Sequence, residues 1–233
     1  LTDEKSGDAG FVGLLEGSDL EWIEQVGWSA DAGLRVTELP AAASGGAIQN
    51  AQRSRAVAWL VLALISLANF GNFYVYDSIG PVADLLQRQR SFSDSQIGML
   101  NAIYSLPNIV LLLVGGILVD RYGTARMLVG TGLVCLAGAA LTAFSPGYPG
   151  MAAGRLLFGI GAETFNIATI TAIVKYFSGR NLAFAIGTSI ALGRAGGFSA
   201  DMSPTWFAAA YAAGWQPPLV IATLLAALSA AAV

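Results

Sequence analysis

The decisive stretch of this sequence is residues 116–126, which read GILVDRYGTAR. Gly116 and Gly123 flank the charged pair Asp120 and Arg121, and Arg126 follows. Long apolar runs lie on both sides of the stretch. It therefore fits a tight loop at a membrane surface, with its charges outside the hydrocarbon and a transmembrane helix on either side. The stretch predicts a helical membrane protein.

The composition indicates a membrane protein independently. Of the 233 residues, 55% are hydrophobic and 12% are charged, about half the charged fraction of a soluble domain. Mean hydropathy is +0.62. Residues 1–50 hold nine of the 15 acids but two of the 12 Lys and Arg, which leaves six acids and ten bases elsewhere. We expect an acidic, mostly disordered cytosolic segment over residues 1–54 and a transmembrane domain over residues 55–233.

Six segments of the second domain are long and apolar enough to span a bilayer, which takes about 20 residues. Backbone groups in lipid must be satisfied within the segment, so the segments are expected to be helices. Turn-forming residues separate them, at Gly80-Pro81, 120–123, 145–150, 178–179 and 216–218. The sequence predicts an all-α bundle of six transmembrane helices, over residues 57–76, 97–119, 127–144, 151–177, 182–200 and 219–233.

Several kinds of chemistry are excluded by the residue types. The chain has no histidine, and its single cysteine, Cys135, lies in an apolar run. A zinc site, a Ser-His-Asp triad and an intrachain disulfide are therefore not expected. No glycine-rich nucleotide loop is present. The sequence predicts no enzyme, no metal and no cofactor, and the acidic N-terminal segment argues against nucleic acid as a partner.

The distribution of Lys and Arg predicts the orientation in the membrane. With the N-terminus in the cytosol, the outer side carries two basic residues, Arg88 and Arg90. The inner side then carries six, which are Arg53, Arg55, Arg121, Arg126, Lys175 and Arg180. A cytosolic N-terminus is therefore expected, with the 120–126 loop on the same side.

Two charged residues are expected deep in the membrane. At about 1.5 Å per residue, Glu163 lies about 21 Å from the cytosolic end of the fourth predicted helix, and Arg194 lies about 20 Å from the same face on the fifth. An unpaired charge at this depth costs several kcal/mol, so each needs a partner. The two residues either form a structural ion pair or face a cavity, where they bind the ammonium and the carboxylate of a zwitterionic substrate.

Two spacing patterns resemble the major facilitator superfamily of transporters. The 116–123 stretch fits G-x-x-x-D-R-x-G, and Arg155, Gly159 and Gly161 fit R-x-x-x-G-x-G. The resemblance implies a twelve-helix fold in two halves with the substrate between them, of which this chain is the N-terminal half and lacks the C-terminal six-helix half.

The resemblance also implies roles for both patterns. The loop residues Gly116, Asp120, Arg121, Gly123 and Arg126 are expected to form a conformational latch, in which Asp120 caps the next helix and pairs with cations. Thr124 and Ala125 replace a basic pair that is common in the family. In the fourth helix, the two glycines permit close helix contact. Arg155 either relays protons or packs against neighbouring helices.

Within the superfamily, residues 76–194 look most like the lysosomal dipeptide transporter branch. The similar pieces are Tyr76-Asp77, 104–108, 115–121, 158–163 and 194–196. The resemblance implies facilitated diffusion of dipeptides, with Glu163 and Arg194 holding the two termini. It implies Tyr104 and Asn108, beside the proline kink of the second helix, as weaker cavity candidates.

The branch also implies a location and a partner. These are a lysosomal membrane and a glycosylated single-pass accessory protein. The chain has no N-x-S/T sequon, which is compatible with such a partner and equally with a plasma or inner membrane of a prokaryote.

Three functions remain open. The first is a uniporter of dipeptides or similar zwitterions. The second is a proton-coupled carrier of organic anions or drugs, in which Glu163 titrates and Arg194 holds the anion. The third is a non-transporting membrane scaffold. The pH dependence of uptake and competition by dipeptides separate the first two, and the third predicts no stabilisation by any solute.

Overall fold

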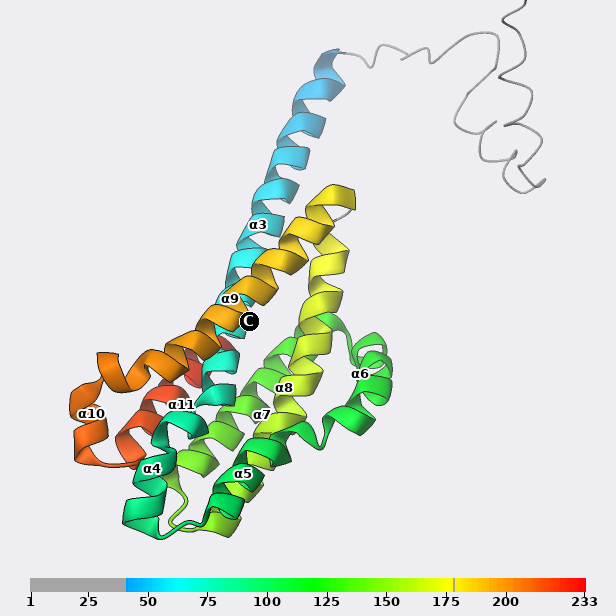
Figure 1. The fold of residues 1–233 in the computed structure, drawn as a ribbon. Helices are drawn as coiled ribbons and strands as arrows, with labels where there is room; N and C mark the ends of the chain where they lie inside the picture. The colour runs from blue at the N-terminus through cyan, green and yellow to red at the C-terminus, as the bar shows by residue number, and fades with distance from the viewer. Residues whose placement is uncertain (1–40, 178) are drawn as a thin grey trace, which may run out of the picture. The chain divides into compact units, whose positions relative to one another are not determined.

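A computed structural model describes residues 41–177 and 179–233, with side chains described for residues 55–111, 114–177 and 181–233. In this part of the chain every regular element is a helix (Figure 1), so the predicted all-α class is confirmed. Arg53–Val233 form one compact unit. Residues 1–40 of the expected acidic segment lie outside the described residues, and the first described helix begins at Ala41.

Each of the six predicted spans falls on one helix or on consecutive helices. Predicted span 97–119 is the one built from more than one piece, and the helices of the first and fifth spans are each followed by a further short helix. The elements in chain order are α3 (Ala41–Asp77) and α4 (Ile79–Arg90); α5 (Asp94–Ala102), the 3-10 helix η1 (Ile103–Ser105) and α6 (Asn108–Tyr122); α7 (Thr124–Phe144); α8 (Tyr148–Tyr176); α9 (Gly179–Trp206) and α10 (Ala208–Ala213); and α11 (Gln216–Ala231).

Three of these helical segments are long and apolar enough to cross a membrane, judged over the described residues alone. They are Arg55–Arg90, Thr124–Phe144 and Tyr148–Tyr176, and the bent pair around α6 makes a fourth if it counts as one span. Helix α11 is apolar but has 16 residues. Helix α9 has 28 residues, but its glycines and Arg194 lower its hydropathy. The fifth and sixth spans therefore depend on their neighbours in the bundle.

The prediction that Gly80-Pro81 ends the first span is wrong. Helix α4 begins at Ile79, and Ser78 alone separates it from α3. Pro81 lies in the first turn of α4, where a helix leaves backbone N–H groups without partners, so a residue that lacks the N–H is tolerated. The first span therefore continues as far as Arg90. For the same reason, the prolines of 216–218 do not precede α11 but lie in its first turn.

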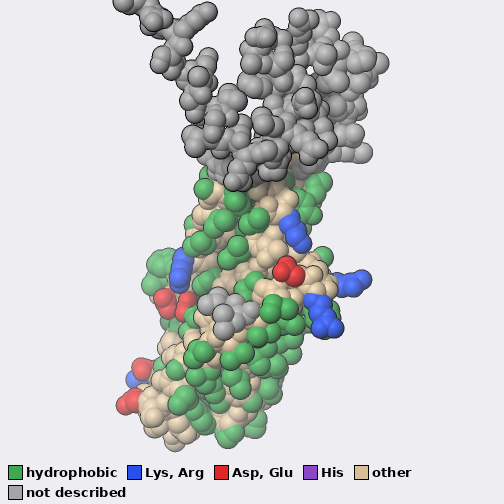
Figure 2. Space-filling model, turned by 90° about the vertical axis from the view of Figure 1, so that its right-hand side faces the viewer, with side chains coloured by type: hydrophobic (Ala, Val, Ile, Leu, Met, Phe, Trp, Pro, Cys, Tyr) green, Lys and Arg blue, Asp and Glu red, His purple; other side chains and the backbone are tan. Residues whose placement is uncertain are grey.

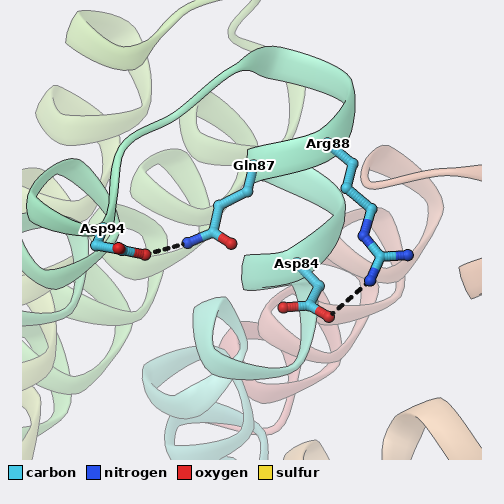
Figure 3. A network of polar contacts seen from close by, with 4 residues as sticks. All are labelled: Asp84, Gln87, Arg88 and Asp94. Atoms are coloured by element: carbon cyan, nitrogen blue, oxygen red, sulfur yellow. Dashed lines mark hydrogen bonds and ion pairs between the residues drawn. The ribbon is translucent and has the colours of Figure 1, made fainter.

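A short polar turn joins α4 to α5 (Figure 3). The side chain of Gln87 donates a hydrogen bond of 2.6 Å to the Asp94 carboxylate, and Arg88 lies 3.5 Å from Asp84 in an exposed ion pair. Ser93 opens α5 with a capping box. An exposed ion pair contributes at most about 1 kcal/mol, so the cap and the Gln87 hydrogen bond hold this turn.

The second span is interrupted where the sequence places its proline. The α-helix gives way to η1 at Ile103 and resumes at Asn108, directly after Pro107. The segments Asp94–Leu111 and Val114–Tyr122 then make an angle of 69°. The predicted kink is therefore present, and the strong change of direction follows about one helical turn after the proline.

Helices α7 and α8 lie side by side (Figure 1) and pack through facing glycines. A Cβ atom on Gly138 would lie 2.8 Å from the carbonyl oxygen of Gly154, and one on Gly154 would lie 2.6 Å from the backbone nitrogen of Thr142. Small residues let membrane helices approach this closely. These two glycines therefore set the distance between the two helices.

The outer surface of the bundle is apolar. Hydrophobic side chains are spread over the face shown in Figure 2, and large ones such as Ile109, Leu228 and Phe198 are 75%, 63% and 60% exposed. A soluble protein rarely shows apolar surface on this scale. The surface fits contact with lipid.

The facing glycines give a test of the helix packing. We expect Gly138→Leu to destabilise the protein by about 1–3 kcal/mol, since the added side chain overpacks the α7–α8 contact. Gly130→Leu is the matched control, because Gly130 lies on the same helix with nothing within 4 Å of its added Cβ. Thermal unfolding in detergent measures both. Equal midpoints for the two variants would contradict the packing.

Candidate functional site

A buried arginine joins three segments of the bundle. The Arg155 side chain, on α8, is 1% exposed. It donates three hydrogen bonds to backbone carbonyls, from Nε to Leu100 (3.2 Å), from Nη1 to Val75 (2.9 Å) and from Nη2 to Tyr76 (2.7 Å). These carbonyls lie near the ends of α3 and α5, where the helical hydrogen-bond pattern is interrupted and acceptors become available.

The arrangement of Arg155 supports packing over proton relay. All three of its donor nitrogens bond to main-chain oxygens. Among the described side chains, the one ion pair within 4.0 Å is Arg88–Asp84, so Arg155 has no acid in direct contact with which to exchange a proton. Its geometry is that of a residue which satisfies buried backbone acceptors.

Tyr104 belongs to the surroundings of Arg155. The Arg155 Cζ atom lies 4.6 Å from the centroid of the Tyr104 ring, and the ring centroids of Tyr104 and Tyr76 lie 3.9 Å apart. Gly159, one turn after Arg155, makes this contact possible, because a Cβ there would collide with the Tyr104 carbonyl oxygen. Gly161 faces the other way, and a Cβ there would lie 2.7 Å from the Cys135 sulfur of α7. Both glycines of the pattern thus lie at close helix contacts.

Glu163 lines a small cavity between α8 and α3. The side chain is half-buried. The cavity has a volume of about 20 Å³ and is walled by Asn72, Phe73 and Tyr76 of α3 and by Ala162, Glu163 and Asn166 of α8. This volume holds about one water molecule. Glu163 is therefore surrounded by two amides and two aromatic rings.

Arg194, on α9, also lies beside Phe73 of α3. It is exposed, and its Cζ atom is 5.3 Å from the centroid of the Phe73 ring, within the range of a cation–π contact. Gly193 allows α9 to approach Phe73 closely, because a Cβ at this position would lie 2.9 Å from the Phe73 ring.

Helices α3 and α9 run parallel along this contact. The Asn69 amide donates a hydrogen bond of 2.8 Å to the Ser189 hydroxyl. One turn further along both helices, Phe73 lies against Gly193. Another turn further, a Cβ on Gly197 would collide with the Asp77 carboxylate. Matching steps of four residues fix the register of the two helices.

The structure brings Glu163 and Arg194 to the same ring but not to each other. Both lie beside Phe73, and no ion pair between them is formed among the described side chains. The structural ion pair, one of the two alternatives from the sequence, is therefore absent from this structure. What remains is an acid and a guanidinium that both lie beside Phe73, neither with an ion-pair partner among the described side chains.

Asn108 is not part of this arrangement. It is exposed at the start of α6, and Tyr104 contacts Arg155 and Tyr76 and does not line the Glu163 cavity. Conversely, Asn72, Phe73 and Asn166 line the cavity although the sequence analysis did not select them. The two asparagines could have been identified by their polarity, because an amide within an otherwise apolar helix carries a cost in lipid that requires a partner or a role.

Comparison with known proteins identifies the family. The family model described as Major Facilitator Superfamily matches residues 65–233. The chain belongs to the major facilitator superfamily. It is 32% identical over 175 residues to the lysosomal dipeptide transporter MFSD1 of Bos taurus, which is 73% of this chain and 37% of that protein.

The chain is also similar to two further proteins. The lysosomal dipeptide transporter MFSD1 of Homo sapiens is 31% identical over 141 residues, covering 59% of this chain and 30% of that protein. The probable sulfoacetate transporter SauU of Cupriavidus necator is 24% identical over 163 residues, covering 70% and 37%. The chain spans less than two-fifths of the length of these relatives.

The loop between α6 and α7, which carries the G-x-x-x-D-R-x-G pattern, differs from the expected structure. Helix α6 ends at Tyr122, Gly123 turns the chain with a positive φ of 84°, and α7 begins at Thr124. Asp120 was expected to cap α7, but this is wrong, because the N-cap is Gly123 and no side chain caps the helix.

The charged residues of the loop also differ from a closed latch. Asp120 and Arg126 are exposed, and neither forms an ion pair with a described side chain. Arg121 lies 5.8 Å from the Tyr122 ring, and Gly116 is half-buried in α6. A different contact, from Lys175 Nζ to Thr124 Oγ1 (2.5 Å), joins the end of α8 to this loop.

The buried arginine gives a sharp test. We expect Arg155→Lys to destabilise the protein by at least about 2 kcal/mol, since an ammonium on a flexible chain does not reproduce a planar fork that reaches three fixed carbonyls. The exposed Arg88→Lys is the matched control and should change stability by less than about 0.5 kcal/mol. Thermal unfolding in detergent compares the two, and an unaltered Arg155→Lys midpoint would contradict the assigned hydrogen bonds.

Proposed function

We propose that this chain is the N-terminal half of a secondary transporter that moves dipeptides or similar small zwitterions by facilitated diffusion and alternating access. In this proposal Glu163 binds the substrate ammonium and Arg194 binds the carboxylate. The latch loop and the contacts of Arg155 serve the conformational cycle, and no chemical reaction is catalysed.

The observation that carries the proposal is that Glu163 and Arg194 both lie beside Phe73 and form no ion pair with each other. Two charges that were present only to neutralise each other would pair directly, because an unpaired charge away from water costs several kcal/mol. Here each keeps an open side, Glu163 toward its cavity and Arg194 toward the surface. A ligand with an amine at one end and a carboxylate at the other satisfies both.

The setting of the site is part of the same proposal. The similarity to dipeptide transporters supports the substrate class. We propose a transmembrane domain over residues 55–233, a cytosolic acidic segment over residues 1–54, and a C-terminal six-helix half that completes the cavity. The membrane is lysosomal with a glycosylated accessory protein, or a plasma or inner membrane if the protein is prokaryotic.

A proton-coupled carrier of organic anions is the second candidate. It is favoured by the similarity to a probable sulfoacetate transporter and by the lack of an ion-pair partner for Glu163 among the described side chains. In this case Arg194 holds the anion and Glu163 carries the proton. Uptake into liposomes would then depend on a pH gradient and cease when a protonophore removes it, whereas a uniporter continues.

The substrate assignment is tested by blocking one end of the ligand at a time. The full-length protein is unfolded thermally with a free dipeptide, its N-acetyl form and its C-terminal amide. A ligand at about 100 times its dissociation constant stabilises by about 2.7 kcal/mol. We expect the free dipeptide to stabilise most. Glu163→Gln should abolish the preference over the N-acetyl form alone, and Arg194→Gln the preference over the amide alone.

The matched control for this test is Arg88→Gln, which removes an exposed cation near the C-terminal end of the first span. It should leave every preference unchanged. Stabilisation by organic anions but not by dipeptides would replace the proposal with the second candidate. The absence of stabilisation by any solute, with both site variants affecting expression alone, would indicate a scaffold.

A further inference from the structure

A cavity larger than the Glu163 cavity lies elsewhere in the bundle. It has a volume of about 580 Å³ and lies at the end of the bundle that carries the loop between α6 and α7. Residues 122–126 line it, together with Lys175 and Tyr176 at the end of α8 and Val61, Leu64 and Ile65 of α3. Ligand pockets commonly measure about 300–1,000 Å³, so this one has the size of a binding site.

Two cations stand at this cavity. Arg126, at the start of α7, is exposed and forms no ion pair with a described side chain. Lys175, also exposed, donates one hydrogen bond to Thr124. An ammonium has three donors, so two remain for a ligand. The lining contains no acidic residue, so the lining itself carries a net positive charge from these two cations.

The rest of the lining is apolar. Val61, Leu64 and Ile65 form one wall, and Leu128 and Ala172 extend it into the bundle. Hydrophobic surface dominates the cavity, while its cations and tyrosines lie at helix ends, where a membrane protein meets the polar headgroup layer. The cavity thus offers a charged end and an apolar end in one space.

We propose that this cavity binds an anionic phospholipid, with the phosphate held by Arg126 and Lys175 and an acyl chain against Val61, Leu64 and Ile65. Basic pockets between transmembrane helices bind anionic headgroups in this manner. The loop that joins α6 to α7 forms part of the wall, so an occupied cavity would fix the position of that loop. The site is independent of the transported solute.

Native mass spectrometry of the full-length protein in detergent tests the proposal. The protein is titrated with phosphatidylglycerol, with phosphatidylcholine of the same acyl chains, and with soluble glycerophosphoglycerol. We expect phosphatidylglycerol to bind at least ten-fold more tightly than either of the others. Arg126→Gln and Lys175→Gln should each weaken its binding about five-fold, which corresponds to about 1 kcal/mol for each cation removed.

Two variants serve as controls. Arg88→Gln removes an exposed cation far from the cavity and should leave the affinity unchanged. Thr124→Val removes the hydrogen bond of Lys175 but no charge, so it should change binding less than two-fold and separates loss of charge from disturbance of the loop. Equal binding of the two lipids, equal binding of the soluble headgroup, or no effect of Arg126→Gln would each overturn the proposal.

Discussion

The three hydrogen bonds of the Arg155 guanidinium are the constraint on which the rest of this bundle depends. They fix the rotation of α8 about its own axis, because the planar fork reaches carbonyls on both α3 and α5. Once that rotation is set, the residues one and two turns further along face predetermined neighbours. Gly159 lies against the η1 backbone, and Glu163 lies against α3 beside Asn72 and Phe73.

The same hydrogen bonds explain why two membrane helices can be interrupted. A break within a bilayer exposes backbone acceptors that lipid does not satisfy. The first span breaks at Ser78 and the second at Ile103, and the acceptors that Arg155 binds lie within four residues of these breaks. A buried charge with no acidic partner is ordinarily costly, but here the donors and the freed carbonyls satisfy each other. The irregular backbone and the buried arginine therefore require one another.

The sequence predicted the elements well and the directions of side chains poorly. Long apolar runs and the turn at Gly123 located the helices, since both signals are local. Helix rise placed Glu163 and Arg194 at one depth, but depth says nothing of the angle around a helix axis. That angle is set by contacts distant in the sequence, such as Gly193 against Phe73. No local signal in the sequence therefore identifies Phe73 as the residue that both charges share.

The positions of Asn108 and Asp120 depend on packing that the local sequence does not specify. Pro107 predicts a kink but not which way its neighbours face, and Asn108 is exposed and does not line the Glu163 cavity. The resemblance implies that Asp120 caps α7, but the N-cap is Gly123, whose φ is positive, and no side chain caps the helix. The local sequence predicts that a helix bends or that the chain turns. The direction depends on the packing of the segments on either side.

Helix α3 packs against both helices that carry the candidate site, α8 and α9. It lies parallel to α9, with Phe73 opposite Gly193, and it shares the Glu163 cavity with α8. In the proposed function, a ligand that binds both charges would contact α3 near Phe73, beside which both charges lie. A small ion satisfies one charge and leaves the other open, whereas a molecule with separated ammonium and carboxylate groups satisfies both. In the proposed function, this need to satisfy both charges favours a zwitterion over a simple anion.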